Sequence, residues 1–162
     1  MKLELFKVDP AYLRFLHKID SRVSVKFNNR PFVGVLTMIN GMKYVLPLTS
    51  QTTEERKKRG KKRRKSVLTT FIKQSDGLEI ANILHNNMIP VIDEVIEPIS
   101  IDAKVDSYLA NEIRFIRKNS EGIIEKASNV YNRRVSKYND FYMIACCDFE
   151  QLERKMGEFF QS

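Results

Sequence analysis

The sequence is poor in the residues that build metal and nucleotide sites. It contains two cysteines, two histidines, six glycines and no tryptophan among 162 residues. Cys146 and Cys147 are adjacent, so a bridge between them would be strained, and we expect reduced cysteines packed in a strand. Without a CxxC or HExxH spacing, a zinc site is not expected. The scattered glycines form no phosphate-binding loop, which excludes dinucleotide and P-loop enzymes, and we expect no cofactor.

Long apolar runs are also absent. No stretch approaches the roughly 20 apolar residues that a membrane-spanning helix needs, and residues 1–10 lack a signal-peptide core. Hydrophobic residues nevertheless make up 43% of the chain, with ten Phe and six Tyr, which is ample for a buried core. We therefore expect one domain over residues 1–162, located in the cytoplasm and without a membrane partner.

The positive charge is confined to one segment. The chain has 28 Lys and Arg against 20 Asp and Glu, a formal net charge of +8. Arg56 to Lys65 holds nine basic residues and no acidic one, so the remaining 152 residues sum to −1, with 19 basic against 20 acidic. Such a cluster can displace counterions from a phosphate backbone and predicts a nucleic-acid partner. Because residues 51–65 contain no apolar side chain, we expect a basic loop that is mobile until a polyanion neutralises it.

The hydrophobic pattern changes period along the chain and indicates strands first and helices later. Strands are expected at 2–7, 32–39, 43–48, 66–73, 78–84 and 141–146. Helices are expected at 10–19, 102–120 and 123–131, with a break at Gly122, and from 149 onward. Asn40-Gly41 predicts a hairpin turn, and Asp9 and Asp148 predict helix caps. Hairpins without βαβ repeats indicate an α+β fold around an antiparallel sheet or half-barrel.

Two hydroxyl residues, Thr49 and Ser50, lead from a predicted buried strand directly into the basic loop. Cleaving RNA without a metal requires deprotonation of a 2′-hydroxyl, protonation of the leaving 5′-oxygen and stabilisation of the phosphorane charge. Hydroxyls at a strand end with cations nearby could serve these steps, but the same pair is also typical of an ordinary turn. His85, beside two asparagines, could likewise be a general acid or base or a structural histidine.

Five motifs occur in the order expected of one protein family. They are Asn29–Val35 (NRPFVGV), Ile39–Tyr44 (INGMKY), Pro47–Ser50 (PLTS), Asn87–Val91 (NMIPV) and Glu112–Ile116 (EIRFI). Over nearly its whole length the sequence resembles the ToxN/AbiQ family of type III toxin–antitoxin endoribonucleases. The resemblance implies a strongly curved antiparallel sheet with flanking helices, related to the MazF/Kid toxin fold. It implies metal-independent cleavage of cellular mRNA that leaves a 2′,3′-cyclic phosphate and a 5′-hydroxyl.

The resemblance also implies an RNA partner. This would be a small repeated RNA antitoxin that the toxin cuts into pseudoknot units, which inhibit the toxin and form a closed ribonucleoprotein assembly with it. Such systems are bacterial and serve phage defence.

The family's site residues map onto this sequence one by one. Thr49 and Ser50 are expected at the scissile phosphate, Tyr12 matches a tyrosine of the N-terminal helix, and Phe27 and Phe115 match aromatic residues near the RNA. Further expected RNA contacts are Asn29, Arg30, Lys61, Lys62, Arg63, Arg64, Lys65 and His85.

The sequence departs from the family directly after Ser50. Many members have Ser-Pro-Lys there, with a catalytic lysine, whereas this chain has Gln51 and Thr52. We expect Lys57 or Lys58 to be brought back to the phosphate by a longer loop with a helical turn. The residue chemistry by itself leaves another interpretation open, a non-catalytic RNA- or DNA-binding protein that uses the basic loop as an electrostatic arm.

Overall fold

A computed structural model describes residues 3–25, 32–100 and 107–161 of the chain. Within these residues an antiparallel sheet has the strand order β4-β5-β3-β2-β1-β7, and β6 pairs with β3 outside this path. The strands are β1 (Leu5–Val8), β2 (Phe32–Ile39), β3 (Met42–Thr49), β4 (Thr69–Lys73), β5 (Glu79–Leu84), β6 (Ile89–Pro90) and β7 (Ile96–Pro98). The sheet is open, with β4 and β7 at its two edges, and the α+β prediction is confirmed.

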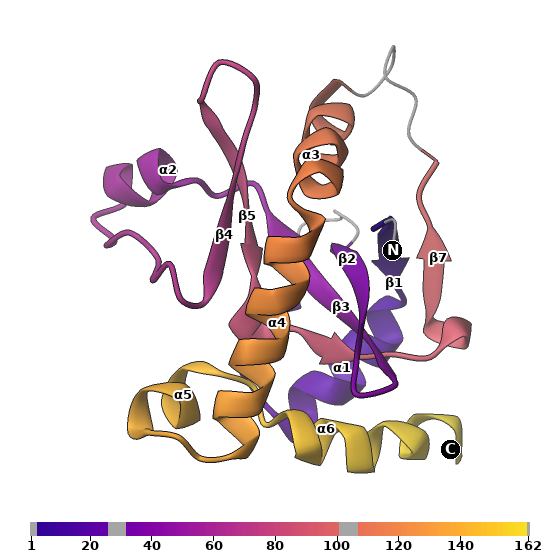
Figure 1. The fold of residues 1–162 in the computed structure, drawn as a ribbon. Coiled ribbons are helices and arrows are strands. Elements are labelled where there is room, and N and C mark those ends of the chain that lie inside the picture. The colour runs from indigo at the N-terminus through magenta and orange to yellow at the C-terminus, as the bar shows by residue number, and fades with distance from the viewer. Residues whose placement is uncertain (1–2, 26–31, 101–106, 162) are drawn as a thin grey trace.

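Helices cover the sheet from two directions (Figure 1). The α-helices are α1 (Pro10–Ile19), α2 (Thr53–Lys58), α3 (Ser107–Lys118), α4 (Ser120–Val135), α5 (Asp140–Ala145) and α6 (Phe149–Lys155). Short 3₁₀ turns are η1 (His85–Asn87), η2 (Asp93–Val95) and η3 (Met156–Gln161). The α3 helix contacts β4 and α4 contacts β2, whereas α6 contacts α1 and β6.

The β2–β3 hairpin forms where the sequence predicts it. Asn40 and Gly41 take φ angles of 51° and 79°, the left-handed region that Asn and Gly tolerate. Gly34 on β2 is needed for another reason, because a Cβ atom there would collide with the Val45 side chain and the Leu46 carbonyl on β3. The absence of a side chain therefore lets the two strands approach closely.

An aromatic cluster joins this hairpin to the helices. The ring of Tyr44 on β3 lies 5.8 Å from that of Tyr131 on α4 and 6.0 Å from that of Phe149 on α6, measured between centroids. The hydroxyls of both tyrosines donate to a carboxylate oxygen of Glu153, at 2.5 and 3.0 Å. Strand β3, which leads to Thr49 and Ser50, is thus held by a buried and hydrogen-bonded contact with α4 and α6.

Both predicted helix caps are present. Asp9 accepts a hydrogen bond from Ala11 N at 2.9 Å and Asp148 accepts one from Gln151 N at 3.2 Å. In a capping box the Gln151 side chain would satisfy the amide of the cap residue. Here Asp148 N donates instead to Oδ2 of Asp20, at 2.7 Å, which ties the start of α6 to the end of α1.

Three predictions about local structure are wrong. Residues 141–146 belong mainly to helix α5 and not to a strand, because Asn139 caps that helix by accepting from Tyr142 N at 3.2 Å. Cys146 and Cys147 are buried and reduced as expected, but they follow a helix. Helix α4 runs through Gly122 without a break. The start of the predicted helix at 102 lies outside the described residues, which resume at 107.

Candidate active site at the exit of strand β3

The polypeptide leaves the sheet at Thr49 and Ser50. Thr49 pairs with Asn82 on β5, and its Oγ1 accepts a hydrogen bond from Gln51 N at 3.1 Å, so its hydroxyl shapes the turn. Ser50 is exposed. The exit therefore presents one anchored hydroxyl and one hydroxyl on a residue that solvent can reach.

The basic loop that follows, predicted as a segment that is mobile until a polyanion neutralises it, contains the short helix α2 at Thr53–Lys58. Thr52 caps helix α2 by accepting from Glu55 N at 3.3 Å. Glu79 on β5 accepts hydrogen bonds from Thr53 N at 2.6 Å and from Thr53 Oγ1 at 2.8 Å. This short helix needs no apolar face, because a polar side chain of the sheet holds its first turn. The helical turn expected between Ser50 and the lysines is present.

Glu79 is the acidic anchor of this loop. It also accepts a hydrogen bond from Asn82 Nδ2 at 3.0 Å. Burial raises the pKa of its carboxyl, but hydrogen bonds from Thr53 and Asn82 lower it, and the net pKa is below the ordinary value. Glu79 is thus ionised at neutral pH and accepts all three bonds as a carboxylate.

Arg64 brings a cation back to the exit. Its Nη1 donates to the Gln51 carbonyl at 2.6 Å and to Asn82 Oδ1 at 3.0 Å, and its Nη2 donates to Gln51 Oε1 at 3.1 Å. Burial and, to a lesser extent, the charge of Arg56 lower its pKa to about 10. The guanidinium therefore stays protonated at neutral pH, next to the residue that follows Ser50.

The other basic residues of the loop are arranged differently. Arg56 reaches Gln51 Oε1 at 3.4 Å and the Lys62 carbonyl at 2.8 Å, and the guanidinium of Arg63 lies 3.9 Å from the centroid of the Phe71 ring. The predicted cations of the site, Lys57 and Lys58, are exposed on α2, which Figure 1 shows set apart from the sheet. Lys61, Lys62 and Lys65 are also exposed. Two arginines, and not the α2 lysines, make the side-chain contacts at the exit.

Two predicted site residues lie in the core. Tyr12 is 0% exposed and its hydroxyl donates to the Pro90 carbonyl at 2.6 Å, while burial raises its pKa above the ordinary value. His85 is 0% exposed, and its Nε2 lies 2.8 Å from Thr70 Oγ1. Burial, followed by the charge of Lys126, lowers the pKa of His85 to about 3, so the ring is neutral. The structure does not bring either residue to the exit. The buried position of His85 is typical of a structural histidine, the second interpretation left open by the sequence.

Phe115 lines a groove together with basic residues that the sequence reasoning did not select. This pocket of about 320 Å³ lies between α3 and the β4–β5 hairpin, and Lys73, Arg114 and Lys118 contribute its cations. Two of these cations could have been predicted from the sequence, because Arg114 and Lys118 are four residues apart and therefore share one helix face. Phe27, Asn29 and Arg30 lie outside the described residues.

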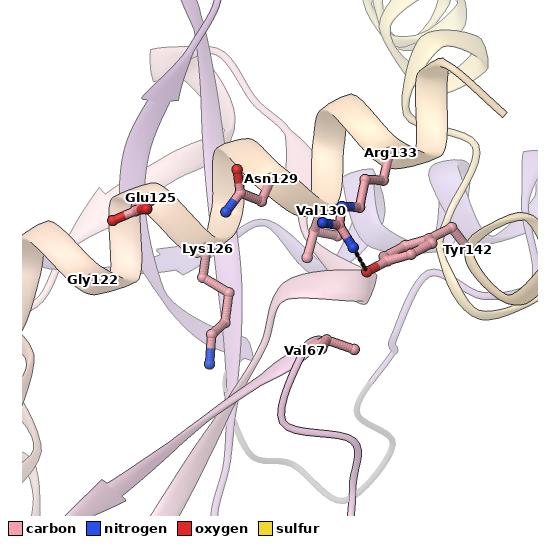
Figure 2. A pocket seen from close by; sticks show the side chains of 8 residues that line it. All are labelled: Val67, Gly122, Glu125, Lys126, Asn129, Val130, Arg133 and Tyr142. Carbon is pink, nitrogen blue, oxygen red and sulfur yellow. Dashed lines mark hydrogen bonds between the residues drawn. The ribbon is translucent and has the colours of Figure 1, made fainter. Parts of the chain in front are cut away.

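Lys126 was also missed. Its ammonium donates to the carbonyls of Ser66 and Thr69, at 2.8 and 2.9 Å, and so fixes the chain where the basic loop returns to the sheet. Figure 2 shows Lys126 among the residues of a pocket of about 330 Å³ along α4, in which Arg133 donates to the Tyr142 hydroxyl at 3.0 Å. No sequence signal predicts the Lys126 contacts, because they join positions about 60 residues apart.

Among residues 3–25, 32–100 and 107–161, no three His, Cys, Asp or Glu side chains come together as metal ligands would. In the same ranges, no helix is both long and apolar enough to span a membrane.

Comparison with known proteins decides the family. A family model described as toxin ToxN of the type III toxin–antitoxin system matches residues 4–157. The chain belongs to the ToxN toxin family. The endoribonuclease AbiQ of Lactococcus lactis subsp. lactis is 30% identical, with 96% of this chain and 88% of AbiQ covered. The endoribonuclease ToxN of Bacillus thuringiensis subsp. kurstaki is 29% identical, with 94% and 81% covered. This ToxN-family chain is an RNA-cleaving enzyme, as its resemblance to the family implied.

Solved structures agree with this assignment. The structure of AbiQ, a lactococcal anti-phage endoribonuclease of the type III toxin–antitoxin system, superposes with a TM-score of 0.84 at 26% identity and full coverage of both chains. A second structure, from work on selective toxin inhibition by a non-coding RNA pseudoknot, superposes with a TM-score of 0.82 at 28% identity, again with full coverage. The ToxN-family chain therefore has the AbiQ/ToxN toxin fold.

Proposed function

We propose that this ToxN-family enzyme cleaves RNA without a metal ion at the Thr49–Ser50 exit and leaves a 2′,3′-cyclic phosphate and a 5′-hydroxyl. The observation that carries the proposal is the exposed Ser50 at the end of β3, next to Gln51, whose carbonyl accepts a hydrogen bond from the half-buried Arg64 of the basic loop. In this reaction the 2′-hydroxyl loses its proton to solvent and its oxygen attacks the adjacent phosphorus, the P–O5′ bond breaks, and the 5′-oxygen takes up a proton from solvent. The Ser50 hydroxyl would donate to a non-bridging oxygen of the phosphorane, and Thr49 holds the turn that aims it.

The cation that stabilises the phosphorane comes from the basic loop. Lys57 and Lys58 are the candidates that the sequence predicts, and Arg64 ties the returning end of the same loop to the exit. A positive charge fixed beside the developing negative charge lowers the barrier because it does not have to reorganise during the reaction.

Cleavage assays on purified protein test this proposal. Ser50→Ala should lower the cleavage rate about 100-fold or more, the usual effect of removing one transition-state donor. Ser66→Ala removes an exposed serine hydroxyl at the other end of the loop and should leave the rate unchanged. The products should accept phosphate from polynucleotide kinase at their 5′ ends and resist periodate at their 3′ ends, and the reaction should continue in EDTA. An undiminished Ser50→Ala rate, or loss of cleavage in EDTA, would reject the mechanism.

We further propose that the partner is a small repeated RNA antitoxin, which the enzyme cuts into pseudoknot units that then inhibit it in a closed assembly in the cytoplasm. The structure related at 28% identity concerns toxin inhibition by a non-coding RNA pseudoknot. In this chain the basic loop and the groove of Phe115 offer cations and an aromatic ring, which suit phosphates and unstacked bases. Cellular mRNA would be the substrate of the free toxin.

Expression in bacteria tests the partner. The wild type should arrest growth, Ser50→Ala should not, and the natural DNA upstream of the coding sequence should relieve the arrest by encoding repeats. Arrest that persists when a transcribed upstream repeat is present would contradict this proposal.

A further inference from the structure

Next to the exit lies a pocket whose lining is basic. It has a volume of about 280 Å³, and its polar lining residues are Arg56, Arg64, Lys65, Thr69, Asn86 and Asn87, with Leu68 and Leu84 completing the wall. None of its lining residues is an Asp or a Glu. A small hollow with three cations and uncharged polar side chains is suited to an anion the size of a phosphate group.

Arg64 is prepared for such a ligand. A guanidinium has five N–H groups, and three of those of Arg64 are used in bonds to Gln51 and Asn82. The Nε–H and one Nη2–H have no protein partner among the residues that the structure describes. Glu79, the acid whose charge acts on Arg64, accepts hydrogen bonds from Thr53 and Asn82. The guanidinium is thus immobilised on one side while two donors stay available.

The pocket adjoins Ser50 without containing it. Ser50 is not among the lining residues, yet Arg64 is bonded to the carbonyl of Gln51, the next residue in the chain. Consecutive phosphates of one RNA strand could therefore occupy the exit and the pocket at the same time. A phosphate held in the pocket would fix the register of the strand, and with it the nucleotide presented at Ser50.

We propose that this pocket, hereafter the Arg64 pocket, binds the RNA backbone phosphate adjacent to the one that is cut, through Arg64 and Lys65. The inference rests on the proposed function, because it takes the Thr49–Ser50 exit as the place of cleavage. Arg64 is a positioning residue in this scheme. It orients the strand and does not contact the reacting atoms.

Replacement of single phosphates tests the pocket. The probe is a ten-nucleotide RNA centred on the cleavage position mapped from the enzyme's own products, with 2′-O-methyl riboses to prevent cutting. Neutral methylphosphonates replace its phosphates one at a time, and binding to the full chain is measured. With wild-type protein, one replacement directly beside the cleavage position should weaken binding about tenfold, the loss expected for one charge-assisted contact.

The protein variants identify the partner of that phosphate. In Arg64→Ala and in Lys65→Ala the same replacement should cost less than about threefold, since part of its contact is already missing. Arg64→Ala also removes the hydrogen bond to Gln51 and could disturb the exit itself. Lys65→Ala tests the pocket without this effect, because the exposed Lys65 side chain does not bind Gln51. The control variants Lys61→Ala and Lys62→Ala, with the same charge change outside the pocket, should keep the full tenfold loss.

The two proposals fail separately. A tenfold loss that persists in both Arg64→Ala and Lys65→Ala, or an equal loss at every phosphate, overturns the pocket while cleavage that depends on Ser50 stands. Without products that depend on Ser50, the proposed function itself fails before the probe can be designed.

Discussion

Replacing Glu79 with Ala should release α2 from the sheet without unfolding the protein. Glu79 accepts three hydrogen bonds, two from Thr53 and one from Asn82. Asn82 in turn accepts from Arg64, so Glu79 supports both the start of α2 and the residue that anchors the end of the basic loop. The substitution removes the three hydrogen bonds of Glu79 at once and leaves the core unchanged, because Glu79 is only half-buried.

The size of the effect follows from these contacts. A hydrogen bond contributes about 1 kcal/mol net, and water can replace part of it at a half-exposed site, so we expect a loss of about 2 kcal/mol in the local stability of α2. This corresponds to a roughly 30-fold decrease in the protection of its amides against hydrogen exchange, since about 1.4 kcal/mol is a factor of ten. Arg56 N, which donates to the Thr52 carbonyl at 3.0 Å, is the reporter.

Glu54→Ala provides the matched control. It removes the same charge from an exposed residue in the first turn of α2, so only a helix-dipole contribution of about 0.5 kcal/mol, or a twofold change in protection, is lost.

The pH dependence of the amide protection is a second test of the Glu79 anchor. The folded pKa of Glu79 is depressed, so its contribution is complete above its unfolded pKa of about 4.3 and is lost as the pH falls through the folded pKa. Equal protection of Arg56 in wild type and Glu79→Ala would refute the anchoring argument.

Two further predictions concern the core. Burial raises the pKa of Asp20, but hydrogen bonds, chiefly from Arg22, lower it below its ordinary value. Asp20→Asn should therefore cost about 3 kcal/mol of unfolding free energy in urea at pH 7, and the difference from wild type should shrink as the pH falls below about 4. Cys146 and Cys147 are buried, and burial raises their pKa values to about 11 and about 12. Ellman's reagent should label neither thiol in the native protein and both in urea, and rapid native labelling would contradict their burial.

Elements with local determinants could be predicted from the sequence. The strand Phe32–Ile39 was expected with the bounds that it has, because Asn40 and Gly41 adopt their turn angles whatever surrounds them. Residues 141–146 were wrongly predicted as a strand because they include aromatic and β-branched residues, which have high strand propensity. These residues form a helix because Asn139 caps it and because Tyr142 is buried against α4. Only the cap could be recognised from the sequence.

The site was predictable only in part. The strand end at Thr49 and Ser50, the candidate site, could be predicted because a strand runs straight into a charged segment. The contact of Arg64 with Gln51 could not be predicted, since the two are thirteen positions apart and nothing in their spacing indicates that the loop turns back. For Tyr12 the family pattern gave a position on a helix but not the face that the helix buries, and that face packs on Pro90 and Phe159.

The hydrogen bond from Asp148 N to the Asp20 carboxylate has a consequence for folding during translation. The end of α1 carries the acceptor, but the donor and the ring of Phe159, which packs on Tyr12 at 5.3 Å, come from residues 148–159, far later in the chain. A nascent chain without residues 148–159 leaves the Asp20 carboxylate short of a partner and the Tyr12 ring uncovered. For a protein whose activity harms its own cell, the cutting fold is thus complete only after residues 148–159 have been translated, and a chain truncated before them should be harmless.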